Sequence, residues 1–251
     1  MNKLGTWRLA AIAGLLLAGC AVRPAGDGDI AHSAWAQQSG ASPGPACPPW
    51  QHRTFPGKRP DRFAYARVDG RDTIAVQADA SVSMLHQALR IAPGQLGQLR
   101  FSWKVPALIA HADLATREDD DAPVRIVLAF EGDRTRFSAR DAALSELVRA
   151  LTGEELPYAT LMYVWGNRRA PGSVVPSPRT GRIRRIVVES GAAGLNRWRD
   201  YERDIRADYL RAFGEPPGAL VGIAIMTDSD NTHSQARAWY GPVRLLPVKA
   251  H

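Results

Sequence analysis

LRFSWKV, residues 99–105, is the clearest indication of the fold in the sequence. Apolar and polar side chains alternate along it without a break, and Pro106 ends the run. Because successive side chains of a strand point to opposite faces of the sheet, this alternation predicts a strand with one buried and one solvated face. Strands of that kind are typical of antiparallel sheets. The segment therefore favours an antiparallel sandwich over a parallel α/β sheet.

Eight further segments have strand character. They are residues 62–68, 73–77, 82–89, 124–130, 160–165, 183–189, 220–226 and 236–245. Two of them, residues 124–130 and 220–226, are almost continuously apolar, which indicates strands at the centre of the core.

Only two helices are expected. The first has Leu144, Leu147, Val148 and Leu151 at helical spacing, with Ser138 as its cap and Gly153 as its end. The second ends at Gly214. Since strands and helices do not alternate, the sequence predicts a mainly β fold: a two-sheet antiparallel β-sandwich of the jelly-roll type with two inserted or flanking helices.

The first twenty residues have the layout of a bacterial lipoprotein signal. Lys3 and Arg8 precede a short apolar run that ends in Leu17-Ala18-Gly19-Cys20. This ending resembles a lipobox, which implies removal of residues 1–19 and attachment of lipid to Cys20. We therefore expect a lipid-anchored protein of the bacterial cell envelope, on the periplasmic face of the outer membrane.

The remaining chain divides into a tether, one domain and a tail. Residues 20–49 are rich in Ala, Gly, Ser and Pro and lack apolar periodicity, so they predict a flexible tether that also holds Cys47. A single sandwich domain is expected over residues 50–247, followed by a tail at 248–251. The composition, with 45% hydrophobic and 23% charged residues, is typical of a globular domain. It excludes a disordered protein and a multi-span membrane protein.

Two acidic runs adjoin the two apolar strands. One contains Asp119, Asp120 and Asp121, before residues 124–130, and the other contains Asp228, Asp230 and Asn231, after residues 220–226. If these strands are antiparallel neighbours, the two runs meet at one edge of the sandwich. The gathered carboxylates could hold a structural calcium ion at Asp228 and Asp230, or pair Asp121 with Asp228 or Asp230 as acid and base for glycoside cleavage. Alternatively, they bind loop backbone and stabilise turns.

Aromatic residues form a second candidate set. Indoles stack on the apolar faces of sugar rings, so Trp165 and Asn167 in the run WGNRR predict a glycan-contacting loop. Trp103, Trp198, Trp239 and Tyr240 are further candidates, although the alternation around Trp103 places that residue in the core. The competing interpretation is that most of these rings pack inside a sandwich.

Motifs of common enzyme classes are absent from the sequence. It has no phosphate-binding loop, dinucleotide fingerprint, nucleophile elbow or zinc-protease motif. We therefore expect no cofactor other than the structural calcium ion. Removal of Lys3 and Arg8 with the signal lowers the formal net charge from +7 to +5. Nucleic acid is not an expected partner behind a secretion signal.

Five motifs resemble those of a bacterial family called domain of unknown function 3047. They are the runs at residues 55–58, 119–125, 158–165, 186–191 and 226–232. The closing run is also similar to the end of galactose-binding-like sandwich modules. The resemblance implies a sandwich and assigns no activity.

These observations favour a non-catalytic, membrane-tethered module that binds a carbohydrate. The alternatives are a structural module that binds another envelope protein and a periplasmic glycan hydrolase with the aspartate pair. The sequence makes no prediction of the oligomeric state.

Overall fold

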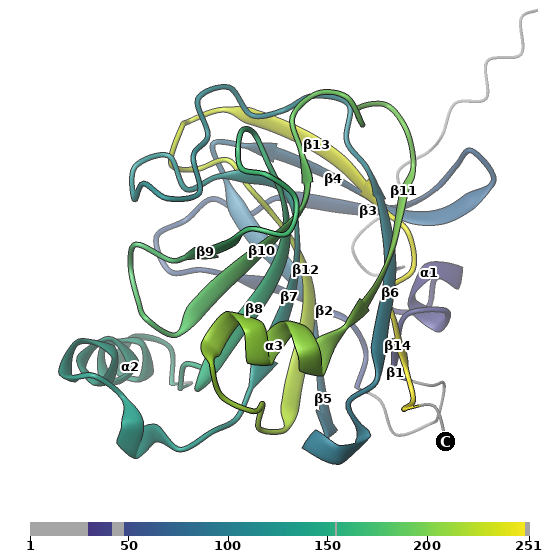
Figure 1. The fold of residues 1–251 in the computed structure, drawn as a ribbon. Helices are drawn as coiled ribbons and strands as arrows, with labels where there is room; N and C mark the ends of the chain where they lie inside the picture. The colour runs from purple at the N-terminus through teal and green to yellow at the C-terminus, as the bar shows by residue number, and fades with distance from the viewer. Residues whose placement is uncertain (1–29, 42–47, 154, 249–251) are drawn as a thin grey trace, which may run out of the picture.

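The computed structural model describes residues 30–41, 48–153 and 155–248. Two seven-stranded sheets face each other across the core, and few helices accompany them (Figure 1). The predicted mainly β sandwich is confirmed.

Sheet A consists of β1 (Gly40–Ala41), β3 (Arg62–Val68), β4 (Arg71–Asp79), β6 (Gln98–Lys104), β11 (Arg199–Asp204), β13 (Gln235–Tyr240) and β14 (Arg244–Leu246). Its order is β1-β14-β6-β13-β4-β3, with β11 also paired to β6. The alternation that predicted β6 is observed, because Leu99, Phe101 and Trp103 enter the core between the sheets.

Sheet B consists of β2 (Gln51–Thr54), β5 (Val82–Ile91), β7 (Ala122–Phe130), β8 (Ala159–Gly166), β9 (Val174–Pro176), β10 (Ile183–Ser190) and β12 (Leu220–Asp228). Its order is β2-β5-β12-β7-β8-β10-β9. A second apolar cluster, which includes Val127, Met162 and Met226, covers part of its outer face. Because β7 and β12 are buried on both faces there, they are almost continuously apolar.

The sheets are not wholly antiparallel. β10 runs parallel to β8, because the connection between them carries β9, which pairs antiparallel with β10 and reverses the chain. The predicted strand at residues 236–245 is divided by Gly241 and Pro242 into β13 and β14. Proline has no backbone N–H for a ladder, so the chain changes partners at this point.

Three α-helices are described, α1 (Ala34–Gln37), α2 (Ala139–Thr152) and α3 (Ile205–Phe213), with two short 3-10 helices at Pro93–Gln95 and Arg134–Arg136. The side chain of Ser138 caps α2, and Gly153 ends it in a left-handed conformation, as the sequence predicts. Its apolar side is only partly covered, however. Leu147 and Leu151 are 56% and 67% exposed, and α2 lies at the left edge of the fold in Figure 1.

The tether prediction is wrong for residues 30–41, which pack on the domain. Trp35 of α1 is fully buried, with its ring centroid 4.8 Å from that of Trp50. β1 pairs in parallel with β14, so this segment extends sheet A. The predicted signal, the lipid site at Cys20 and Cys47 lie outside the described residues. Within the described ranges, no helix has the length and apolarity needed to cross a membrane.

Candidate functional site

The two acidic runs meet at one edge of sheet B. β7 and β12 are antiparallel neighbours, with Ala122 opposite Asp228, which confirms the predicted placement. One carboxylate oxygen each from Asp121, Asp228 and Asp230 lies within 4.8 Å of the others. This geometry brings the two acidic runs together.

Two buried arginines stand inside this acidic group. The guanidinium of Arg125 on β7 lies 3.1 Å from Asp228 and 3.4 Å from Asp120. Arg185 on β10 also pairs with Asp120, and it donates to the Pro176 carbonyl at 2.8 Å. The side chains of Arg125 and Arg185 are 4% and 1% exposed. The carboxylates are therefore neutralised largely by the protein itself.

Other members of the runs organise the loops. Asp121 accepts hydrogen bonds from the backbone N–H of Asn231 at 3.2 Å, and from the Thr232 N–H and hydroxyl at 2.8 and 2.6 Å. The Asn231 amide donates to the Asp120 carbonyl at 3.1 Å, and the Thr116 hydroxyl to the Asp119 carboxylate at 3.2 Å. These contacts support the alternative interpretation, in which aspartates stabilise turns.

Burial perturbs the ionisation of the cluster. It raises the pKa of Asp228 to about 7; the positive charge of Arg125 opposes this rise, and the nearby Asp121 carboxylate adds to it. The Asp228 Oδ1 atom has no hydrogen-bond partner among the described residues. Calcium prefers six to eight oxygen ligands, whereas Lys58 already pairs with Asp230 and Arg125 with Asp228. The chain's own cations thus occupy much of the predicted calcium site.

The same burial disfavours the predicted acid–base pair. Glycosidases need two carboxylates about 5 Å or more apart, with the sugar between them. Here Asp121 is only 1% exposed and Asp228 only 7%, so a sugar cannot lie between them. The cluster does not present a pair that a glycosidic bond can reach.

The predicted glycan contact at Trp165 is wrong. Its ring is fully buried in the core, and its Nε1 donates to the Gly191 carbonyl at 3.0 Å. The Asn167 amide donates to the Ile109 carbonyl at 2.7 Å, which makes it a loop support. A sugar ring cannot stack on an indole that has no exposed surface.

Trp239 is different, because it is half-buried on the outer face of sheet A. Its neighbours Ala238 and Tyr240 enter the core, so alternation directs Trp239 outward. Opposite it stand Ala75 on β4 and Lys104 on β6. Ala64 on β3 is opposite Ala75, so two small side chains form a low shelf beside the indole.

Lys104 and Asp69 lie between Trp239 and a second half-buried indole, Trp198. Trp198 Nε1 donates to the Asp69 carboxylate at 3.0 Å, and Lys104 donates to the same carboxylate at 2.8 Å. Lys104 Nζ lies 5.9 Å from the centroid of the Trp239 ring. These hydrogen bonds hold the pKa of Asp69 below its usual range, so it stays ionised. We name Trp239, Lys104, Asp69 and Trp198 the tryptophan strip.

A cavity of about 430 Å³ adjoins the strip. Arg71, one of its lining residues, lies 5.0 Å from the centroid of the Trp198 ring and pairs with Asp200 at 2.6 Å. Arg100, Ser102 and other polar residues of sheet A also line this space. The strip and the cavity together extend across the outer face of the sheet.

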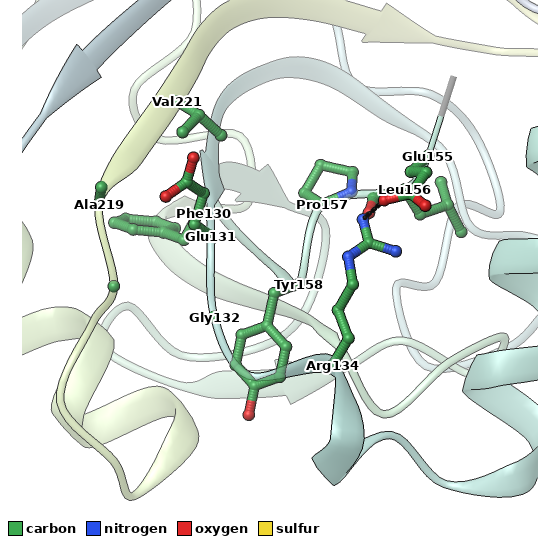
Figure 2. Close-up of a pocket in the computed structure, with 11 residues that line it drawn as sticks. Phe130, Glu131, Gly132, Arg134, Glu155, Leu156, Pro157, Tyr158, Ala219 and Val221 are labelled. Atoms are coloured by element: carbon green, nitrogen blue, oxygen red, sulfur yellow. Dashed lines mark hydrogen bonds and ion pairs between the residues drawn. The ribbon is translucent and has the colours of Figure 1, made fainter. Parts of the chain in front are cut away.

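Another cavity, of about 480 Å³, lies at the end of sheet B (Figure 2). The Tyr158 ring and the Arg134 stem stand across it from Phe130. Its charged groups are already paired, Arg134 with Glu155 at 3.1 Å and Glu131 with Arg90 outside the picture. The cavity contains none of the residues that the sequence singled out.

Fold and site define a β-sandwich domain with two half-buried indoles and hydrogen-bonded charges on one solvated sheet face. The xyloglucanase domain of NopAA, a type three effector from Sinorhizobium fredii solved in complex with cellobiose, is similar in structure. The TM-score is 0.41 at 10% identity, and the match covers 79% of this chain and 93% of that chain. No curated protein matches the sequence. The chain belongs to the family described as protein of unknown function (DUF3047), whose model matches residues 48–244.

Proposed function

We propose that this domain is a non-catalytic module that binds a glycan on the outer face of sheet A. The tryptophan strip carries the proposal. Two half-buried indoles offer apolar surface for the C–H faces of sugar rings, and Asp69 and Lys104 between them offer an acceptor and donors for hydroxyl groups. Binding sites commonly combine apolar surface with a few placed polar groups in this way.

The arrangement suits an extended ligand. The low shelf of Ala64 and Ala75 leaves space beside Trp239, and the 430 Å³ cavity continues the surface beyond Trp198. Most of these groups stand on or beside paired strands, which limits the entropy lost when a ligand binds. Burial of Asp121 and Asp228 supports binding over hydrolysis, because the predicted acid–base pair is inaccessible.

Titration of the full chain with envelope polysaccharides and their oligosaccharides tests the proposal. Trp239→Ala is expected to weaken binding about tenfold, which corresponds to about 1.4 kcal/mol. Phe137→Ala is the matched control, because Phe137 is also a half-buried aromatic residue but stacks on Tyr158 away from the strip. Equal affinities of the two variants, or no measurable binding by the unmodified protein, would contradict the proposal.

We also propose that lipid on Cys20 holds the module at the outer membrane, on its periplasmic face. Support comes from the apolar run and lipobox-like ending in the sequence. Cells fed radiolabelled palmitate should label the protein, and Cys20→Ala should lose the label while Cys47→Ala keeps it. Label that persists in Cys20→Ala would refute the anchor.

A protein-interaction module is the second candidate, and one observation favours it. Leu147 and Leu151 on α2 are mostly exposed, although they belong to the apolar side of an amphipathic helix. Crosslinking in intact cells should then capture an envelope protein, and Leu147→Glu with Leu151→Glu should abolish the capture. A capture pattern unchanged by these substitutions would count against this role.

A further inference from the structure

Positive charge without a carboxylate partner is concentrated beside Trp239. Arg62 on β3 and Arg237 on β13 both stand opposite Gln77 on β4, so the three side chains form one row on the outer face of sheet A. Both arginines are exposed, and no carboxylate of the described residues pairs with either. With strands spaced about 4.8 Å apart, their backbones are roughly 10 Å apart.

Three other cations on this face have carboxylate partners. Arg71 pairs with Asp200 at 2.6 Å, and Lys104 is held by Asp69 at 2.8 Å. Arg100 likewise pairs with Glu202 at 2.6 Å. The shelf beside Trp239 therefore carries excess positive charge at Arg62 and Arg237.

The position of Arg237 limits what can bind there. Its guanidinium carbon lies 4.9 Å from the centroid of the Trp239 ring, and Lys104 approaches the same ring. A neutral sugar that stacked on this face of the indole would displace Arg237 and gain nothing from its charge. An anionic group would instead accept hydrogen bonds from Arg237 while the sugar ring that carries it lies beside the Trp239 indole and over Ala75.

At the far end of the surface, Arg244 provides another guanidinium without a carboxylate partner in the described chain. It lines the 430 Å³ cavity and donates to the backbone carbonyl and side-chain oxygen of Gln38, at 3.1 and 2.8 Å. Both ends of the tryptophan strip therefore present arginines, whose planar fork suits carboxylate and phosphate groups.

From this arrangement we infer that the ligand of the tryptophan strip is an anionic polysaccharide, with carboxylate or phosphate groups along its chain. The inference rests on the proposed glycan binding and narrows the ligand class. Arg62 and Arg237 bind the anionic groups at one end, Arg244 binds them at the other, and the two indoles hold the sugar rings between.

Binding of polygalacturonate and of its full methyl ester to the full chain tests the inference, because esterification removes the charge and keeps the sugar backbone. The acid form is expected to bind about tenfold more tightly, with an affinity that falls as NaCl is raised. Phosphorylated dextran, compared with plain dextran, distinguishes phosphate from carboxylate recognition. Polyglutamate serves as an anion without sugar.

Substitutions test whether Arg62 and Arg237 bind the acidic polymer. Arg62→Ala with Arg237→Ala is expected to weaken binding of the acidic polymer about tenfold. Arg206→Ala with Arg140→Ala is the matched control, because both arginines are exposed and lie on α3 and α2, away from β13 (Figure 1). Thermal unfolding of each variant verifies that the fold is retained.

The possible results distinguish failure of the anionic-ligand inference from failure of the proposed glycan binding. Equal affinities for charged and uncharged polymers would overturn the inference that the ligand is anionic, but not the proposed glycan binding. No binding of any polymer would overturn both. If polyglutamate binds as tightly as polygalacturonate and Trp239→Ala has no effect, the binding is non-specific charge attraction. That result would overturn the inference.

Discussion

Asp120→Asn tests whether the acidic run before β7 serves the fold. The substitution keeps the shape of the side chain and removes its charge. Arg185 pairs with Asp120 and with no other carboxylate of the described residues, whereas Arg125 keeps Asp228 at 3.1 Å. One guanidinium that is 1% exposed would thus lose its counter-charge. Breaking one side of a buried ion pair costs about 3–5 kcal/mol, which lowers the Tm of a domain this size by roughly 6–20 °C.

Urea unfolding followed by tryptophan fluorescence measures this loss. Asp119→Asn is the control, since the neighbouring carboxylate accepts a hydrogen bond from Thr116 and has no ion pair in the described structure. It should change the free energy of unfolding by less than about 1 kcal/mol. Because the buried pair is shielded from solvent, the cost of Asp120→Asn should persist at high salt. Equal stabilities of the two variants would refute the reasoning.

Three further predictions concern stability. Burial raises the pKa of Asp61 to about 6, so the folded state binds this proton more tightly than the unfolded chain does. The free energy of unfolding should therefore fall by up to about 3 kcal/mol as the pH rises from about 4 to about 6. Asp61→Asn should flatten this slope in urea titrations, and an unchanged slope would exclude Asp61 as its source. Gly218→Ala should lower the Tm, because the added Cβ would overlap the Glu131 carbonyl oxygen. Gly94→Ala is the control and should leave the Tm unchanged, because its Cβ would enter open space. Equal Tm values for the two variants would argue against the close approach at Gly218. Trp35→Ala should cost about 3–5 kcal/mol, and a loss below about 1 kcal/mol would favour a loose tether at this segment.

Local sequence signals were sufficient to predict those elements whose structure is determined by one short stretch of chain. β3 spans the predicted residues 62–68, and α2 begins after Ser138 and ends before Gly153 as expected. A capping hydroxyl and a left-handed glycine act within one helical turn, so their effect is visible in the sequence. The sequence also predicts that the acidic runs meet if β7 and β12 are antiparallel neighbours, and the two strands are paired in this way.

Long-range packing decided the features that the sequence did not reveal. Trp165 and Trp239 both lie in strands, but β8 is buried on both faces and offers no alternation from which to assign a side. Arg185 belongs to a strand with several arginines, a pattern that normally indicates solvent. It is buried because Asp120, 65 positions earlier in the chain, neutralises it. No local pattern encodes that partner.

Charge pairing explains why the carboxylates predicted as a ligand site serve the fold and why our proposed site lies on the other sheet. At the covered end of sheet B, Arg125 and Arg185 are buried and must be matched inside the protein, since an unpaired buried charge is strongly destabilising. The acidic runs provide that match. On the outer face of sheet A, Arg62 and Arg237 remain hydrated and need no internal partner, so they are available to a ligand. The proposed site therefore lies on the sheet face where the arginines are exposed to water and not paired inside the protein.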